Sequence, residues 1–277
     1  MKVAFDALLI AGFVATLLWP SAKAAADGVA VSGVNGKAAL LGGVSKDTGA
    51  GLAEGSLSAP LGDSFGVQLD GAIGKREPRT AGGGGAHVFW RDPQSALVGL
   101  TAERVWIGGR FFDRFGAESE YYRPGWMLAG SAGYQDGFPP HSVYTKLDLG
   151  IYVTEDLLVS SGFHQSGGRY FAVGGIEWQP ILVPNARGIA LFADGGVGTH
   201  DNEFIVAGIR WYFGADKSLE RRHREDDPPN TVGSDLFENA GFINNSTFNS
   251  NGNSGSGGGG SGGGPCHGPS CGVGGPG

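Results

Sequence analysis

The chain has 277 residues, enough for one large all-β domain or two domains of ordinary size. Glycine supplies 53 of these residues and charged residues only 17%, a composition unlike that of a typical helical enzyme. The formal net charge of −7 argues against a nucleic-acid partner, which would require a basic surface.

The N-terminus predicts a secretory signal peptide over residues 1–26. Lys2 supplies its positive charge, Ala7–Trp19 is an apolar core too short for a membrane-spanning helix, and Ser21–Ala26 offers small-residue cleavage sites. A retained membrane anchor is the alternative interpretation. Because no cysteine lies near the cleavage site, a lipoprotein is not expected. We therefore expect the folded chain to begin at Asp27, outside the cytoplasm.

Residues 27–214 are expected to form one domain of short strands separated by turns. Apolar and polar residues alternate along most strands, as they do along Phe65–Gly74, so each strand has an apolar and a polar face. Alternation and turn signals give about twelve strands, and about ten is the alternative because the first two strands and the ninth are weak. The predicted strands are Ala38–Val44, Gly51–Ala59, Phe65–Gly74, Gly82–Arg91, Leu97–Trp106, Phe112–Tyr122, Trp126–Tyr134, Ser142–Val153, Leu157–His164, Tyr170–Trp178, Ile189–Gly198 and Phe204–Phe213.

The predicted strand Ser142–Val153 shows the pattern most clearly. Its odd-numbered residues from Val143 onward are apolar apart from one threonine, whereas its even-numbered residues include Lys146 and Asp148. One face suits hydrocarbon and the other suits water or a polar lumen. Strands of this kind predict a transmembrane, antiparallel, up-and-down β-barrel with its apolar face outwards. A soluble β-sandwich has a similar composition and is the alternative.

The positions of the turns and of the aromatic residues favour a membrane-embedded barrel over a soluble β-sandwich. If the mature N-terminus lies in the periplasm, alternate turns are periplasmic, and these are predicted to be the shortest: Leu61–Ser64, Asp92–Ser95, Arg123–Gly125 and Thr154–Asp156. Outward-facing aromatic residues lie beside these turns or at the periplasmic end of the last strand: Phe65, Trp90, Tyr121, Trp126, Trp178, Trp211 and Phe213. Amphipathic rings gather at membrane–water boundaries, so these residues predict one aromatic girdle.

Polar faces of the predicted strands would line the barrel lumen. The inward acids are Glu54, Asp70, Glu103, Glu118, Glu120, Asp148, Glu177 and Asp194, and the inward bases are Arg91, Arg114, Lys146 and Arg210. This excess of acids predicts a mild preference for cations if the pore is open. The alternative is a closed barrel whose charges pair across a narrow interior, because an inward charge must be paired or solvated.

Three parts of the sequence resemble those of a known protein family: the strand series from Ala38 to Phe213, the closing sequence GIRWYFG at Gly208–Gly214 and the charged run at Arg221–Pro229. The chain resembles bacterial outer-membrane β-barrel proteins, in particular small porin-like proteins of soil α-proteobacteria. The resemblance implies outer-membrane lipid as surroundings and the barrel-assembly machinery as a partner during biogenesis. That machinery usually reads a C-terminal aromatic residue, whereas here a tail follows Phe213, so the assembly signal would be internal.

Residues 215–277 are expected to form a periplasmic tail, first charged and then Gly-rich. Pro228-Pro229 stops any helix that begins in the charged run Lys217–Asp227. Asn251–Gly277 holds 14 Gly in 27 residues, a composition that cannot bury a core. We therefore predict that Pro228–Gly277 is disordered.

Two cysteines, Cys266 and Cys271, lie in this tail with His267 between them. Their even number and the secreted setting favour one disulfide. Two free thiols are the second interpretation and a metal site is the third. A structural zinc site needs about four ligands, and no fourth ligand is evident nearby. We expect neither a metal nor a cofactor.

Catalytic groups are not evident in the sequence, so no enzymatic activity is expected. Ser160 and Ser161 precede His164, but this spacing on a strand does not itself make a catalytic dyad. The Gly82–Gly85 run is followed by neither Lys nor Ser/Thr, and it suits a bend or close packing better than phosphate binding.

The sequence thus predicts a porin-like passive channel for small solutes or a structural envelope component. A surface adhesive or interaction protein and, less favoured, a lipid-modifying barrel enzyme are the alternatives. The sequence leaves the oligomeric state open.

Overall fold

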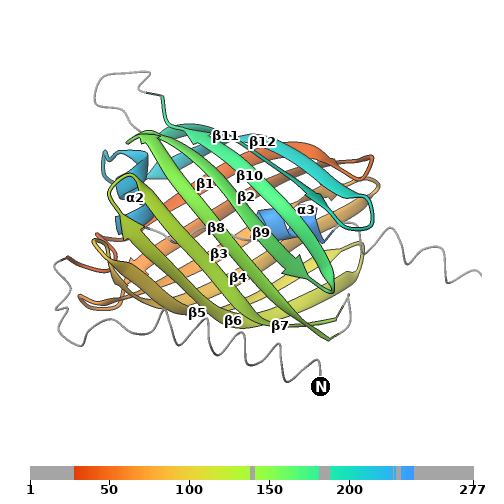
Figure 1. The fold of residues 1–277 in the computed structure, drawn as a ribbon, viewed down its shortest axis with the longest axis horizontal. Coiled ribbons are helices and arrows are strands. Elements are labelled where there is room, and N and C mark those ends of the chain that lie inside the picture. Colours follow the sequence, from red (N-terminus) through yellow and green to blue (C-terminus); the bar gives the residue numbers. More distant parts are fainter. Residues whose placement is uncertain (1–27, 138–140, 181–187, 227, 229–231, 240–277) are drawn as a thin grey trace, which may run out of the picture.

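Twelve antiparallel strands form one closed barrel in which each strand pairs with its neighbour in sequence and β12 pairs with β1 (Figure 1). This computed structural model describes residues 28–137, 141–180, 188–226, 228 and 232–239. The first and last strands close the barrel by pairing along their length, from Gly36 opposite Phe213 to Ser45 opposite Phe204. The predicted all-β, up-and-down barrel of about twelve strands is confirmed.

Each predicted strand corresponds to one strand of the barrel. The strands are β1 (Asn35–Ser45), β2 (Thr48–Pro60), β3 (Phe65–Arg76), β4 (Arg79–Asp92), β5 (Ala96–Ile107), β6 (Arg110–Arg123), β7 (Trp126–Gly137), β8 (Ser142–Thr154), β9 (Leu157–Ser166), β10 (Arg169–Trp178), β11 (Ile189–Gly198) and β12 (Asn202–Phe213). Most of them extend further towards the turns than alternation predicts, because polar and glycine residues continue the backbone ladder without marking a face.

The barrel has two mouths that differ in what they carry. We call the mouth at which β1 begins and β12 ends the near mouth, and the opposite one the far mouth. The near mouth carries the turns that join β2 to β3, β4 to β5, β6 to β7 and β8 to β9. These are the turns that the sequence assigns to the periplasm.

The prediction that near-mouth turns are the shortest is wrong. At the far mouth, β1 and β2 are joined by only Lys46 and Asp47, and β5 and β6 by only Gly108 and Gly109. All four residues have positive φ angles, between 45° and 81°. Two-residue turns with positive φ match the twist of paired strands, and the Lys-Asp pair adopts this conformation without glycine.

Side chains of each strand alternate between the outside and the inside of the barrel. In β8, Leu147 is 40% exposed on the outside, whereas the neighbouring Lys146 is 7% exposed on the inside. Every strand contributes at least one exposed large apolar residue, and together these form an outer apolar belt. One member from each strand is Leu40, Leu57, Leu69, Val88, Leu100, Phe115, Trp126, Leu149, Val159, Ile176, Leu191 and Ile209.

Two short helices follow β12 and turn back towards the lumen. Figure 1 shows α2 (Leu219–Glu225) at one end of the barrel and α3 (Val232–Glu238) inside the ring of strands. The expected disorder from Pro228 onward is therefore wrong for residues 232–239. Val232, Leu236 and Phe237 are 3% exposed or less, because the barrel interior supplies the apolar partners that the tail lacks on its own.

Glycine residues of β4 make room for α3. A Cβ atom on Gly83 would lie 2.7 Å from Val232 Cγ1, and one on Gly85 would lie 3.6 Å from Val232 Cγ2. On the opposite wall, the ring of Phe237 lies 6.4 Å from that of Phe204 in β12. The Gly82–Gly85 run thus serves close packing, one of the two roles that the sequence suggests.

The segment before β1 is also drawn into the near mouth. Ala30 and Val31 are at most 1% exposed, and Val31 belongs to the same apolar cluster as Phe89 of β4. The backbone amide of Ser32 donates to the carbonyl of Glu225 at 3.0 Å, so this segment contacts the end of α2. The predicted signal peptide over residues 1–26 and the cysteine pair Cys266 and Cys271 lie outside the described residues.

Candidate functional site

The candidate site is the lumen, whose wall consists of the inward residues of the strands. The structure places all twelve predicted lumen charges on the inner side. Glu54, Asp70, Arg91, Glu103, Arg114, Glu120, Lys146 and Glu177 have side chains that are buried or nearly so, and Glu118, Asp148, Asp194 and Arg210 are more accessible from within. They gather into several networks.

One network joins three strands on the wall that α3 approaches. His87 of β4 lies between two carboxylates, with Nε2 2.9 Å from Asp70 Oδ2 and Nδ1 2.9 Å from Glu118 Oε2. The Gln68 side-chain amide donates to Asp70 Oδ1 at 2.9 Å. Both ring nitrogens of this buried histidine are therefore engaged, which makes it a structural link between β3, β4 and β6.

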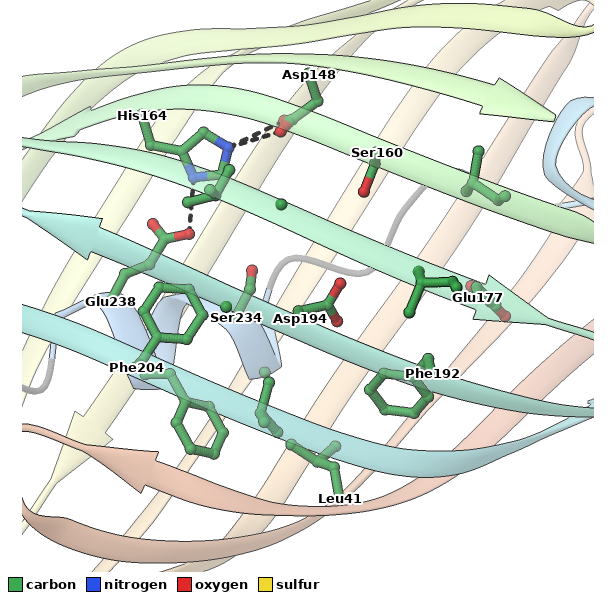
Figure 2. A pocket seen from close by; sticks show the side chains of 18 of the residues that line it. Leu41, Asp148, Ser160, His164, Glu177, Phe192, Asp194, Phe204, Ser234 and Glu238 are labelled. Carbon is green, nitrogen blue, oxygen red and sulfur yellow. Dashed lines mark hydrogen bonds and ion pairs between the residues drawn. The ribbon is translucent and has the colours of Figure 1, made fainter. Parts of the chain in front are cut away.

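A second network holds α3 in the lumen. Asp235 accepts a hydrogen bond from Lys146 Nζ at 2.6 Å and forms an ion pair with Arg114. Glu238 Oε1 lies 2.7 Å from His164 Nδ1, and His164 Nε2 lies 3.0 Å from Asp148 Oδ1, as Figure 2 shows. Two acids of the tail thus contact basic side chains on three strands, a set of partners that sequence reasoning missed.

A third network lies nearer the near mouth. Arg210 Nη1 donates to Glu177 Oε2 at 2.6 Å and Arg210 Nη2 to Glu54 Oε1 at 3.5 Å. The Tyr212 hydroxyl donates to Glu177 at 2.6 Å. His223 of α2 reaches this group, since its Nε2 lies 3.1 Å from the Tyr212 hydroxyl. Helix α2 is therefore bound to the inner wall as well as to the mouth.

Other predicted charges make contacts of their own near the near mouth. The Tyr122 hydroxyl donates to Glu120 at 2.7 Å. Arg91 donates to the carbonyl of Ala30 at 3.3 Å, and its guanidinium lies 4.8 Å from the ring centroid of Phe89. The contact between Arg91 and Ala30 ties the segment before β1 to the wall.

The sequence missed several inward bases. Lys37, Arg76 and Arg169 are buried, with 4 to 8% exposure. Alternation could have found Lys37, which is two residues before the inward Ala39, but the first predicted strand began only at Ala38. Arg76 and Arg169 lie at strand ends that were assigned to loops. The lumen as a whole therefore holds fewer unmatched acids than predicted.

Space remains in the lumen on the side of β8 to β12. A cavity of about 240 Å³ borders α3 and is lined by apolar residues such as Leu41, Phe192 and Phe204 and by carboxylates such as Asp194 (Figure 2). A second cavity of about 200 Å³ lies nearer α2. The two share five lining residues: Asp148, Leu158, Ser160, Glu177 and Arg210.

Carboxylates outnumber the Lys and Arg side chains that line these two cavities. The acids are Glu54, Asp148, Glu177, Asp194 and Glu238, whereas the Lys and Arg side chains are Lys37, Lys146 and Arg210. The cavity walls thus keep an acidic excess although the lumen as a whole is closer to balance. Such a lining attracts small cations more than anions.

Among the described residues, the histidines of the lumen lie against carboxylates. In the described part of the chain, no three His, Cys, Asp or Glu side chains are arranged to hold a metal ion. Ser160 and His164 both line the larger cavity, but both ring nitrogens of His164 face carboxylates. A histidine held in this way is not poised to take a proton from a serine hydroxyl.

Aromatic residues of the outer face lie towards both mouths. The seven predicted girdle residues lie on the outer side at the near-mouth ends of their strands, with Phe65 opposite Trp90 and the Tyr121 ring 5.9 Å from that of Trp126. A second set, which the sequence analysis did not identify, lies towards the far mouth: Trp106, Phe111, Phe115, Tyr134, Phe163 and Tyr170. Aromatic rings at both ends of an apolar belt are the pattern of a membrane-embedded barrel.

The described helices are too short or too polar for any of them to cross a membrane.

Comparison with known proteins adds evidence on the fold. No family model matches the chain, and no curated protein is similar to it in sequence. A structure titled KdgM porin has a TM-score of 0.51 and 5% identity, over 64% of this chain and 99% of that one. A structure of KdgM porin in complex with disordered oligogalacturonate has a TM-score of 0.52, with the same sequence identity and the same coverage of both chains. This chain has the barrel fold of a porin.

A weaker likeness involves an enzyme. Outer membrane phospholipase A from Escherichia coli has a TM-score of 0.46 and 11% identity, over 65% of this chain and 92% of that one. A likeness of this size carries no argument about activity.

Proposed function

We propose that this chain is an integral outer-membrane β-barrel. The outer apolar belt runs through all twelve strands, and a soluble monomer rarely exposes an apolar surface of this extent. A closed barrel also satisfies every strand backbone without a free edge, as a bilayer requires. Outer-membrane lipid would be its surroundings, and the barrel-assembly machinery would insert it by reading Phe213 as an internal signal.

The membrane part of this proposal is tested by electrophoresis of isolated outer membranes, with and without boiling. A closed barrel remains folded in cold detergent and changes mobility when it is heated. We expect such a shift in the outer-membrane fraction. Recovery of the protein in the soluble periplasm with no shift would refute the membrane assignment.

Within the membrane, the barrel acts as a narrow porin-like channel for small solutes, with a preference for cations. The observation that carries this is the pair of adjoining cavities along β8 to β12, which α3 leaves unfilled and which five carboxylates line. Helices α2 and α3 fill much of the remaining lumen, so the full-length chain conducts in small steps. This bore would suit inorganic ions and small organic cations.

Bilayer conductance tests the channel role with the full chain and single substitutions. Asp235→Asn leaves Arg114 and Lys146 without their shared partner, so α3 is expected to undock and the conductance step to rise severalfold. Asp194→Asn should lower the cation-to-anion permeability ratio while the step size changes little. Asp113→Asn, which removes an ion pair on the outer face with Arg104, is the matched control and should behave like the wild type.

Conductance also separates this role from the alternatives. If no variant conducts, the channel role fails and a structural or adhesive envelope role replaces it. An adhesive role read through loops has little support, because most far-mouth turns in the described residues are only two residues long. A lipid-modifying enzyme is disfavoured by the two carboxylates that hold His164.

A further inference from the structure

The segment Leu219–Asn239 makes contacts at successive depths of the barrel, and the first of these contacts lie at the near mouth. The backbone amide of Leu219 donates to Asp156 Oδ1 at 3.1 Å, and Glu220 Oε1 accepts from the backbone amide of Gly125 at 3.0 Å. Gly125 and Asp156 belong to near-mouth turns. Helix α2 therefore lies across the near mouth.

Further along the chain, contacts move into the middle of the barrel. The Pro228 carbonyl accepts from Lys37 Nζ at 3.3 Å and from Gln68 Nε2 at 3.2 Å, and both donors lie a few residues inside the near mouth. Gly233 packs against Glu54, which is near the midpoint of β2. The chain thus descends through the lumen and does not fold back onto α2.

The end of α3 reaches the far mouth. The Phe237 carbonyl accepts from Ser45 Oγ at 3.1 Å, and Asn239 Oδ1 accepts from Ser166 Oγ at 2.9 Å. Ser45 and Ser166 are the last residues of β1 and β9, directly before far-mouth turns. Between Leu219 and Asn239 the polypeptide has therefore crossed the barrel from one mouth to the other.

We propose that the barrel carries its own C-terminus across the membrane, so that residues 240–277 leave at the far mouth. In the orientation with β1 beginning in the periplasm, this mouth faces the outside of the cell. The ion pairs of Asp235 and Glu238 with the wall hold the crossing segment in place.

The consequence of this crossing would be a Gly-rich tail on the same side of the membrane as the far mouth. A segment of 38 residues with the pair Cys266 and Cys271 would be displayed on the cell surface by a barrel whose far-mouth turns are themselves short. This inference rests on the proposed membrane location and is independent of whether the lumen conducts.

Thiol labelling of intact cells tests the inference, because the full chain holds only these two cysteines. The probe is a maleimide coupled to polyethylene glycol too large to pass a porin, added after mild reduction. Two reference variants carry Cys266→Ser and Cys271→Ser together with one new cysteine. Thr199→Cys lies in an exposed far-mouth turn, and Gln94→Cys lies in an exposed near-mouth turn.

We expect the wild-type tail to be labelled in intact cells together with Thr199→Cys, whereas Gln94→Cys is labelled only after the outer membrane is opened. Labelling of the tail only under the conditions that label Gln94→Cys would overturn the inference, whichever mouth faces outwards. Asp235→Ala adds a second readout, since loss of the ion pairs should reduce surface labelling of the tail. Asp113→Asn should leave that labelling unchanged.

Failure of this inference can be told apart from failure of the membrane proposal. If the two reference cysteines are labelled equally in intact cells, the barrel does not separate two compartments, and both proposals fall. If Thr199→Cys and Gln94→Cys are labelled differently and the tail is labelled under the same conditions as Gln94→Cys, only the crossing of the C-terminal segment is refuted.

Discussion

Leu147 and Lys146 are neighbours in β8, yet their surroundings differ in kind. Leu147 is 40% exposed on the outer face, where it lies opposite Phe163, another exposed apolar residue. Lys146 is 7% exposed on the inner face, and its ammonium group lies 2.6 Å from Asp235 Oδ1. An outer residue needs only to be apolar, whereas an inner residue needs a particular partner in a particular place.

The two faces should therefore respond to opposite kinds of substitution. On the outer face, an exchange of one apolar residue for another leaves the lipid contact intact, and a new charge is the costly change. On the inner face, a charge is already present and paired, and removal of its partner is the costly change. Substitutions on adjacent residues can separate these two effects.

The largest effect is expected from a charge on the outer face. Leu149→Arg places a guanidinium group in the middle of the belt and should destabilise the barrel by about 2–4 kcal/mol, enough to impair assembly. Asp148→Asn, one residue earlier on the inner face, should assemble nearly normally, because the Asp148 side chain is 35% exposed to the cavity and Glu238 still pairs with His164. The fraction of protein that shows the heat-dependent mobility shift measures assembly.

Leu149→Met is the matched control for the outer position and should assemble like the wild type. Equal loss of assembly in Leu149→Arg and Asp148→Asn would show that the inner and outer faces of β8 are assigned wrongly.

A smaller effect is expected from two adjacent glycines of β4. A Cβ atom on Gly83 would meet Val232 Cγ1 at 2.7 Å and the carbonyl of Arg104 at 2.9 Å, whereas one on Gly84 would find its nearest neighbour at 3.5 Å. Gly83→Ala should therefore weaken the docking of α3 by about 1–3 kcal/mol, and Gly84→Ala should not. Cleavage by chymotrypsin after Phe237 measures how often α3 leaves the lumen.

The same residue type and the same added methyl group make the second variant a close control. Equal protection of Phe237 in the two variants would mean that α3 does not pack against Gly83.

The strands of the barrel wall could be predicted from the sequence, whereas the C-terminal segment that runs through the lumen could not. Alternation with period two is a local signal, and it placed Lys146 and Arg114 on the inner face without knowledge of their partners. Their partner Asp235 lies 89 residues beyond Lys146, in a segment whose composition indicates disorder. A helix of seven residues has little stability in isolation, so its formation depends on the barrel around it.

A weak signal for α3 was nevertheless present. Val232 and Leu236 are spaced by four residues and Asp235 and Glu238 by three, a pattern that gives a short helix one apolar and one acidic side. The two-residue turn at Lys46 and Asp47 was also beyond reach, since both residues adopt positive φ angles, which are uncommon for residues other than glycine. In both cases tertiary contacts decide what local preference leaves open.

The smallest effect is expected where a carboxylate pairs on the outer face. Asp113 forms a bidentate pair with Arg104 at 2.6 and 2.7 Å, but the Arg104 side chain is 62% exposed, so water can replace the partner. Asp113→Asn should leave the urea midpoint of the folded barrel unchanged. Asp70→Asn is the inner counterpart, and it weakens a buried contact with His87, at a cost of about 1–3 kcal/mol. If the two substitutions shifted the midpoint equally, burial would not be what separates the inner networks from the outer pairs, and lipid contact alone would distinguish the two faces.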